Sequence, residues 1–413
     1  MKHIHIVTFD VPFPANYGGV IDVFYRLKAL SKVGVHVHLH CYENGREQSE
    51  ELEKICYKVH YYKRSLHPVK LFDLTPFIVN TRANKALLGN LLKDNYPILF
   101  EGLHATHLLK HSQLQDRYKI VRAHNIEHEY YWHLCKAESN TFLKLFFATE
   151  AFKLKLYEHV LAYANVVLAI TEDDRHYLKR YGKVVHIPAF HPDQFSKTAS
   201  AIGKGVLYHG NLSVSENRKA VLYLLKNVFN KLSLPVIIAG KNPCKQILKE
   251  AAKLKHVTVK ANPSDSEMLH YINEAQVNVL VTFQSTGIKL KLLNSLLKGR
   301  HCVVNNAMIE KTGLESTCTV ANSPEAIVNA INELYSKPYT DTEHARRKSI
   351  FQELYSNQNS VAQIIGLYDE SQAVRLSANT HYVPVSPKLA ASPVLLSPSP
   401  TPQLALSAKT DCD

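Results

Sequence analysis

The sequence has no apolar run long enough to span a bilayer and no N-terminal stretch with the pattern of a secretory signal. Its first residues lead directly into a predicted strand, so we expect a cytoplasmic protein. The seven cysteines are scattered singly, without a Cys-x-x-Cys pair, which argues against disulfides and a structural zinc site. Zinc-finger spacing, an aromatic–basic RNA motif and a long basic run are also missing. Nucleic acid is therefore the weakest class of partner.

What the chain does have is length and positive charge. Its 413 residues are too many for one ordinary core and suit two α/β domains followed by a tail. The net charge of +13 at pH 7 indicates anionic partners, such as a phosphorylated small molecule or a membrane surface. Six of the eighteen prolines fall within residues 377–413, among Ser, Ala and Thr, which is typical of a disordered tail.

Strand-like and helix-like segments alternate from end to end, a pattern typical of βα units with parallel sheets. We predict strands near residues 4–9, 35–41, 98–100, 120–123, 166–170, 205–209, 236–239, 257–260, 277–282 and 302–305. We predict helices near residues 20–32, 141–163, 217–232, 244–254, 265–274, 288–298 and 343–355. The predicted domains are an N-terminal domain (1–188), a linker (189–204), a C-terminal domain (205–340), helices that could cross back to the first domain (341–373) and the tail (374–413).

One segment predicts a site for an anion. The polar turn Ser285–Gly287 opens an amphipathic helix that carries Lys289 and Lys291 near its start and ends at Gly299. The first N–H groups of a helix lack partners and the dipole is positive there, so lysines at this end make sense if a phosphate sits on them. Lys289 is nearest the helix start and is the better phosphate ligand. We expect Lys291 to lie on the surface.

Three more turns follow predicted strands, where ligands bind in open α/β sheets. The first contains Gly18 and Gly19, which either allow close approach to a ligand or simply make a tight turn. The second spans Arg122–Glu129 and includes two histidines suited to proton transfer or sugar contacts. The third spans His209–Ser213, just before Arg218 and Lys219. Gly210 and Asn211 favour a site, whereas Arg218 and Lys219 individually fit solvated surface charges.

Several other features have ordinary structural explanations. His36, His38 and His40 share one face of a strand, but neighbours on one face lie about 7 Å apart, which is awkward for one metal ion. Asp411-Cys412-Asp413 could bind a divalent cation, but it closes the predicted tail. The segment Phe142–Tyr157 could lie on an anionic membrane, although its apolar residues cover more than one face and favour a buried helix.

Together these motifs resemble the GT-B glycosyltransferases, specifically the large retaining family called group 1 or family 4, over about residues 1–370. The resemblance is most specific in His209–Leu212, in Ala239–Lys241 and in the helix between Gly287 and Gly299. It implies an α/β fold of two Rossmann-like domains that face a cleft. The acceptor would bind mainly to the N-terminal domain and the nucleotide-sugar donor mainly to the C-terminal domain.

The resemblance also implies roles for residues. His124 and Lys289 would be catalytic, and Asn125 and Glu127 would lie on the acceptor side. The donor site would contain Gly18, Gly19, Gly210, Asn211, Arg218, Lys219, Ser285, Thr286, Gly287, Ile288 and Asn294. The family usually has two glutamates separated by seven residues, where this chain has Thr286 and Asn294. Asn294 still offers a donor and an acceptor to the ribose hydroxyls.

The function expected from this resemblance is transfer of a sugar from a UDP- or GDP-type donor to a glycan, a lipid-linked acceptor or another hydroxyl, with retention. The resemblance implies no metal and no cofactor besides the co-substrate. Peripheral contact with the inner face of a membrane is also expected. Two alternatives remain open, a non-catalytic nucleotide-sugar-binding subunit and a GT-B sugar-nucleotide 2-epimerase.

Overall fold

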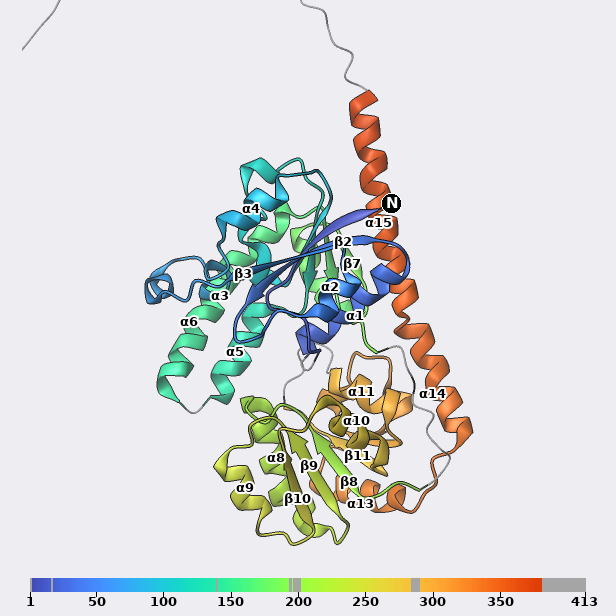
Figure 1. Cartoon of the computed structure of the whole chain (residues 1–413). Coiled ribbons are helices and arrows are strands. Elements are labelled where there is room, and N and C mark those ends of the chain that lie inside the picture. The colour runs from blue at the N-terminus through green and yellow to red at the C-terminus, as the bar shows by residue number, and fades with distance from the viewer. Residues whose placement is uncertain are drawn as a thin grey trace, which may run out of the picture. The chain divides into compact units, whose positions relative to one another are not determined.

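A computed structural model describes residues 2–15, 18–138, 140–192, 195, 202–283 and 290–380. The chain divides into two compact units, residues 1–369 and 370–413. The larger unit contains two β-sheets, each surrounded by helices (Figure 1). All strand pairs in both sheets are parallel, because each strand is followed by a helix that returns the chain to the same end of the sheet. This confirms the predicted fold class.

Within the described residues, the first sheet has seven strands in the order β3-β2-β1-β4-β5-β6-β7. The strands are β1 (His3–Val7), β2 (His36–Glu43), β3 (Lys58–Lys63), β4 (Ile98–Glu101), β5 (Lys119–Ala123), β6 (Val166–Ala169) and β7 (Val184–His186). The helices beside them are α1 (Gly18–Lys32), α2 (Glu50–Ile55), α3 (Phe77–Asn80), α4 (Lys85–Leu91), α5 (Glu127–Ala137), α6 (Thr141–Tyr157) and α7 (Glu172–Leu178). The strand order reverses between β1 and β4, which is where open sheets of this kind bind ligands.

The second sheet has six strands in the order β10-β9-β8-β11-β12-β13 among the described residues. They are β8 (Val206–His209), β9 (Val236–Gly240), β10 (Val257–Ala261), β11 (Val277–Leu280), β12 (His301–Val304) and β13 (Thr319–Val320). The helices are α8 (Ser215–Asn227), α9 (Lys245–Ala251), α10 (Asp265–Glu274), α11 (Leu290–Lys298), α12 (Asn306–Ile309) and α13 (Pro324–Tyr335). Here the order reverses between β8 and β11.

Two further helices follow the second sheet, α14 (Asp341–Leu354) and α15 (Asn357–Thr380). Val361, Ile364 and Leu367 of α15 belong to the same apolar core as Ile4 of β1 and Leu99 of β4. The first turns of α15, up to Leu367, therefore pack on the first sheet. The helix continues to Thr380, past the start of the predicted tail, and residues 381–413 lie outside the described residues.

Most predicted strands are present within a few residues of their expected bounds, because their apolar runs are buried on both faces. The sequence analysis missed β3, β7 and β13, which lie at sheet edges and are short or half exposed. It also missed α5, since Glu127–Glu129 reads as a polar loop. Those charges in fact occupy the first turn of a helix, where acidic side chains are favourable.

The histidines of β2 form hydrogen-bonded pairs with those of β1. Nδ1 of His3 lies 3.0 Å from Nε2 of His38, and Nδ1 of His5 lies 2.8 Å from Nε2 of His40. His40 also contacts the Tyr62 hydroxyl at 2.8 Å. Among the described residues, no group of three metal-ligating side chains is found on these strands. The array therefore uses its imidazoles as partners for one another.

Helix α6 is not the buried helix that the sequence favours. Only Glu150, Ala151 and Leu154 of this helix are buried, whereas Phe142 is 87% exposed and Phe152 is 66% exposed. Leu143, Leu145 and Leu156 are also exposed, whereas Phe147 and Tyr157 pack against the core of the first sheet. No helix in that part has the length and apolar character needed to cross a bilayer.

Candidate functional site

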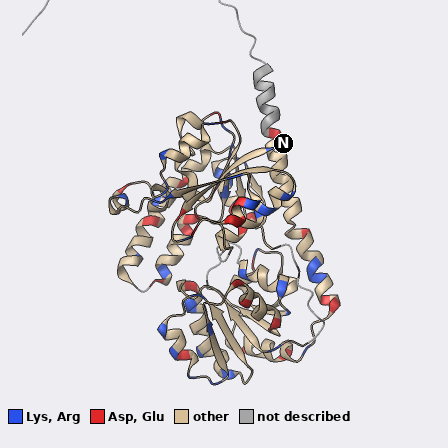
Figure 2. Cartoon of the chain, viewed as in Figure 1, with Lys and Arg blue, Asp and Glu red and all other residues tan. Residues whose placement is uncertain are grey.

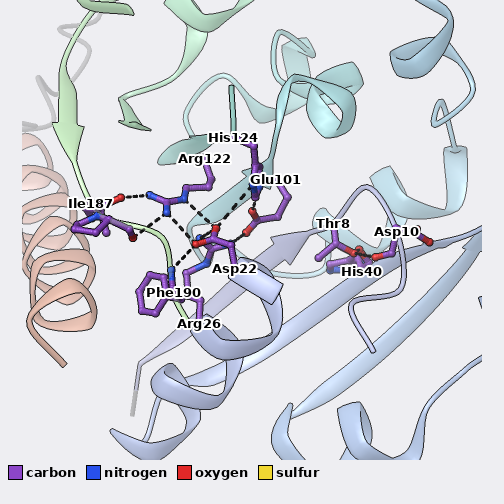
Figure 3. Close-up of polar contacts among 11 residues, drawn as sticks. Thr8, Asp10, Asp22, Arg26, His40, Glu101, Arg122, His124, Ile187 and Phe190 are labelled. Carbon is purple, nitrogen blue, oxygen red and sulfur yellow. Dashed lines mark hydrogen bonds and ion pairs between the residues drawn. The ribbon is translucent and has the colours of Figure 1, made fainter. Parts of the chain in front are cut away.

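The first group of site residues lies where β1, β4 and β5 end. Asp22 of α1, Glu101 at the end of β4 and Arg122 of β5 point toward one another (Figure 3). Arg122 donates from Nε and Nη2 to the two oxygens of Asp22 at 3.1 and 3.0 Å. Arg26, one turn after Asp22, donates to Asp22 at 3.1 Å and also to Glu101. All four side chains are 0–1% exposed.

This network is internally compensated. Burial alone would raise the pKa of Asp22, but the neighbouring Arg122 and Arg26 hold it well below its ordinary value. Arg122 also donates to the carbonyls of Ile187 and Pro188, and Asp22 accepts from the backbone N–H of Phe190 at 2.7 Å. The network thus ties β5 and α1 to the segment that leaves the first sheet.

His124 lies at the open edge of this network, directly after β5. Its Nε2 is 3.0 Å from Oε2 of Glu101, and its Nδ1 is 4.0 Å from Asp22. The side chain is 10% exposed and meets the edge of the Phe9 ring. Glu101 therefore fixes the imidazole while part of the ring stays accessible. The structure brings the predicted His124 together with Asp22 and Glu101, which the sequence analysis did not select.

The two glycines of the first turn have different surroundings. A side chain at Gly19 would place its Cβ 2.6 Å from the Phe9 ring, so only glycine fits beside that ring. A Cβ at Gly18 would come only into ordinary contact with Leu290 of α11, at 3.7 Å. Gly18 therefore lies close to the start of the helix that carries the predicted anion site.

Asn125 is half-buried and Glu127 is buried, just after the end of β5. Both line an internal space of about 10 Å³, roughly the size of one water. Glu127 is 3% exposed, and burial raises its pKa to about 8. Its Oε1 has no hydrogen-bond partner and lies 3.8 Å from Nδ1 of His104. An acceptor-side role for these two residues stays a prediction.

The second group of site residues follows β8. Gly210 donates its backbone N–H to Ala239 at 3.1 Å, and a Cβ there would meet the Asn217 amide at 3.3 Å. The Asn217 side chain donates to the Asn211 carbonyl at 2.9 Å. The Asn211 side chain accepts from Ser213 within the same turn. The turn after β8 is thus held against the first turn of α8.

Lys291 belongs to this group, which corrects the expectation that it lies on the surface. It is half-buried, and its Nζ donates to Oδ1 of Asn217 at 2.8 Å. It also lies 5.3 Å from the centre of the Tyr208 ring. The reason is geometric, because the second position of α11 faces the neighbouring turn after β8. Lys291 helps to lower the pKa of the buried His209 to about 3, although burial is the larger cause.

The remaining predicted donor residues are placed as follows. Arg218 is half-buried and donates to Ser215 at 3.0 Å, while the exposed Lys219 lies 4.9 Å from the centre of the Phe283 ring. Asn294 is half-buried one turn after Lys291 on α11. Ser285, Thr286, Gly287, Ile288 and Lys289 lie outside the described residues.

The charges of the site do not suit a metal ion. Asp22, Glu101 and His124 each offer one ligand atom, and these atoms lie within 4.8 Å of one another. Arg26 and Arg122 already donate to the carboxylates, so an added cation would meet two positive side chains at the same oxygens. Around both sheets, basic and acidic residues are interspersed on the helices (Figure 2).

Sequence reasoning could have found part of what it missed. Asp22 and Arg26 are charged residues four positions apart within an otherwise apolar helix face that includes Val23 and Leu27. A charged pair in such a face requires an internal partner. Glu101 likewise closes a fully buried strand.

Comparison with known structures identifies the overall fold. A sucrose-phosphate synthase from Thermosynechococcus elongatus superposes with a TM-score of 0.66 at 16% identity, covering 91% of this chain and all of that one. An Anabaena protein, HepE, solved with UDP and glucose, superposes with a TM-score of 0.59 at 11% identity and covers 90% of this chain. With two parallel sheets in the described order, the protein has the GT-B fold.

Comparison with known sequences gives a family match for the second domain. Residues 203–337 match the model of the family described as glycosyl transferases group 1. A Klebsiella pneumoniae protein described as an uncharacterized 44.6 kDa protein in the cps region is 27% identical over 354 residues, which are 81% of this chain and 89% of that protein. The chain therefore has the GT-B fold, and its residues 203–337 match a group 1 glycosyltransferase domain.

Proposed function

We propose that this protein transfers a sugar from a UDP- or GDP-type donor to a hydroxyl group of an acceptor, with retention of configuration. The observation that carries the proposal is the position of Lys291. It lies between the start of α11 and the Gly210 turn, inside a group 1 glycosyltransferase domain. A cation at the carboxyl end of β8 is placed to hold the diphosphate of a nucleotide sugar.

Lys291 and the first N–H groups of α11 would stabilise the charge that develops on the leaving nucleoside diphosphate. Positive charge directed at developing negative charge is usually the largest contribution to such catalysis. Lys289 stays in the proposal as the second cation, and Asn294 as the ribose ligand. His124, fixed by Glu101, would hold a hydroxyl of the donor sugar. Because the carboxylates of this site already bind arginines, we propose a reaction without a metal or other cofactor.

The acceptor is proposed from two separate features. The relative from the cps region of Klebsiella supports a glycan or lipid-linked glycan as acceptor and a role in polysaccharide biosynthesis. The chain's net charge of +13 supports an anionic surface as the place where that acceptor is met.

Exposed apolar side chains on two neighbouring segments of the first domain support contact with a membrane. They belong to α6 and to residues 66–74, namely Phe142, Leu145, Phe152, Leu156, Leu66, Val69, Phe72 and Leu74. Phe72 and Leu74 are 88% and 89% exposed. The two segments lie side by side, since Lys153 of α6 donates to the Leu71 carbonyl at 2.6 Å. Lys144 and Lys155 of α6 add positive charge, which suits anionic lipids.

Flotation with vesicles tests this contact. We expect the protein to float with vesicles that contain phosphatidylglycerol and to stay in the pellet fraction with pure phosphatidylcholine. Phe72→Ser with Phe142→Ser should abolish flotation, because both side chains are almost fully exposed. Leu248→Ser on α9, which is 45% exposed, is the control and should float as the wild type does. Equal flotation of the double variant would refute the proposed surface.

Nucleotide binding tests the donor site. Thermal unfolding is measured with UDP, GDP, dTDP and CMP at millimolar concentration for the wild type, Lys291→Ala, Lys289→Ala and the control Lys249→Ala on the exposed face of α9. A nucleotide at 100 times its dissociation constant adds about 2.7 kcal/mol of stability. We expect one nucleotide to stabilise the wild type and the control, and to do so less in the other two variants.

The outcome also separates the alternatives. If no nucleotide stabilises the wild type, the donor-site proposal fails. If a nucleotide binds but no sugar nucleotide is turned over, the protein is a binding subunit, which the absence of the usual glutamates at Thr286 and Asn294 would explain. If the sugar nucleotide is converted to its 2-epimer, the chemistry is epimerisation rather than transfer.

A further inference from the structure

A second polar cavity lies in the C-terminal domain, away from the Gly210 turn. It has a volume of about 200 Å³ and is lined by residues of β12, of α14 and of the segments around β13 and after α13. His301 and Cys302, which line it, are the first residues of β12. The cavity is therefore at the amino end of that strand, whereas the donor residues follow the carboxyl ends of β8 and β11.

The charge of the lining is positive. Lys337, Arg346 and Arg347 face one carboxylate, that of Glu343. Glu343 is 3.4 Å from Lys337 and accepts from the backbone of Thr340, so part of its charge is already used. The lining therefore carries two more positive charges than negative charges.

The two arginines are held in place by backbone carbonyls. Arg347 is 5% exposed and donates to the carbonyls of Leu296, Gly299 and Arg300 at the end of α11. Arg346 donates to the Ser316 carbonyl at 2.6 Å. Neutral carbonyls orient a guanidinium without cancelling its charge, so both arginines keep a net positive charge at the cavity.

A buried hydroxyl in the wall lacks a partner. Tyr339 is 2% exposed, and its OH makes no hydrogen bond within the described residues. Tyr339 lines the cavity, and the Arg347 guanidinium lies over its ring. The central guanidinium carbon is 4.7 Å from the ring centre. A buried hydroxyl without a hydrogen-bond partner is destabilising, so one that belongs to the wall of a cavity calls for a ligand or water.

We propose that this cavity binds a phosphate group, either as inorganic phosphate or as part of a small phosphorylated compound. The volume is well above the ~10–15 Å³ that one water needs and below the ~300–1,000 Å³ of drug-sized pockets. Two arginines and a lysine supply charge-assisted hydrogen bonds, and the Tyr339 hydroxyl supplies a neutral donor. The sugar transfer proposed above does not require a ligand in this cavity.

Tyr339→Phe is the sharpest variant. Because the hydroxyl has no partner without a ligand, its removal should leave the unfolding temperature of the phosphate-free protein unchanged or slightly raised. Phosphate is titrated into the full chain and its dissociation constant is read from the rise in unfolding temperature. We expect a roughly ten-fold weaker constant for Tyr339→Phe and for Arg346→Gln. Lys348→Gln, an exposed neighbour on α14 that does not line the cavity, should bind as the wild type does.

The donor site is excluded by working in the Lys291→Ala background, where binding at this cavity should persist. A local readout comes from Cys318, which lines the cavity and is only half-buried. Phosphate should slow its alkylation by iodoacetamide and leave that of Cys244 on the other side of the sheet unchanged. Glucose 6-phosphate as a second titrant distinguishes free phosphate from a phosphorylated compound, according to which binds more tightly. Equal binding by Tyr339→Phe and the wild type, no protection of Cys318, or the same effect from sodium chloride would overturn the proposal.

Discussion

The two sheet domains handle charge in opposite ways. In the first domain, Asp22, Arg26, Glu101 and Arg122 are buried and neutralise one another. In the second, near the ligand end of the sheet, Lys291 donates to an amide, Arg218 donates to a hydroxyl and Lys219 lies over a ring. Charge in the first domain therefore serves the fold, whereas we expect the cations of the second domain to bind an anion.

This comparison assigns different consequences to similar substitutions. Removing a charge from the first domain leaves its partners buried and unpaired, and so acts on stability. Removing a cation from the second domain leaves neutral groups that remain satisfied by water or by each other, and so acts on binding. The predictions below test that division.

The largest effect is expected for Asp22→Asn. The substitution keeps the shape of the side chain but leaves Arg26 and Arg122 with one negative partner between them. Breaking a buried ion pair from one side costs about 3–5 kcal/mol, and this should appear as a fall in the free energy of unfolding measured by urea denaturation. A cost below about 1 kcal/mol, the range of exposed pairs, would mean that the network does not hold the first domain together.

A smaller effect, on turnover alone, is expected for His124→Ala. The side chain borders the network without closing it, because Arg26 still neutralises Glu101. Loss of a hydrogen bond to the donor sugar should lower kcat/KM by roughly 10- to 100-fold. The stabilisation by the bound nucleotide should not change, since His124 belongs to the first domain. A weaker nucleotide effect in this variant would contradict the division between the domains.

The sequence predicts the fold well, because buried parallel strands such as β5 and β11 have apolar runs that need no long-range information. It also predicts which turns face the ligand edge, since Gly210 and His124 directly follow such strands. These assignments depend on local pattern and on the general geometry of open sheets. Edge strands such as β3 are not predicted, because their residues are half exposed and apolar and polar side chains alternate only weakly along them.

The partners of the site residues could not be predicted in the same way. Lys289 and Lys291 are two positions apart in the sequence, which does not specify which of them turns toward Asn217. The pairing of Asp22 with Arg122 joins positions on α1 and β5 that no local pattern connects. Both depend on how the elements pack, which is set by the whole core rather than by neighbours along the chain.

A third prediction concerns acid and the histidine array of β1, β2 and β3. Burial and the neighbouring histidines lower the pKa of His38 to about 4, and burial holds that of His40 well below its ordinary value. The unfolded chain, with a histidine pKa of about 6.5, then binds more protons than the folded one. The groups that face the array are His3, His5, His60, Lys58, Lys93, Asp94 and Arg117.

The histidine array should make the protein less stable at acidic pH. Because the folded pKa values are depressed, the stability is fully present above about pH 6.5 and is lost as the pH falls toward 4. We expect the unfolding temperature to drop over this range by roughly 2–4 °C for each kcal/mol lost. His38→Gln should flatten the dependence, whereas His270→Gln on the exposed face of α10 should leave it as in the wild type. An unchanged slope in His38→Gln would exclude the array as the cause.

The smallest effect is expected for an ion pair that is exposed to water. Lys311, after α12, pairs with Asp173 of α7, and these side chains are 55% and 56% exposed. Exposed pairs contribute about 0–1 kcal/mol, because solvent screens the attraction and two mobile side chains must be ordered. A double-mutant cycle with Lys311→Gln and Asp173→Asn isolates the coupling from other effects of each change. A coupling near zero that is insensitive to salt, beside a large cost for Asp22→Asn, would show that burial sets the strength of these charges. A coupling as large as that of Asp22 would mean instead that this surface pair fixes α7 against the second domain.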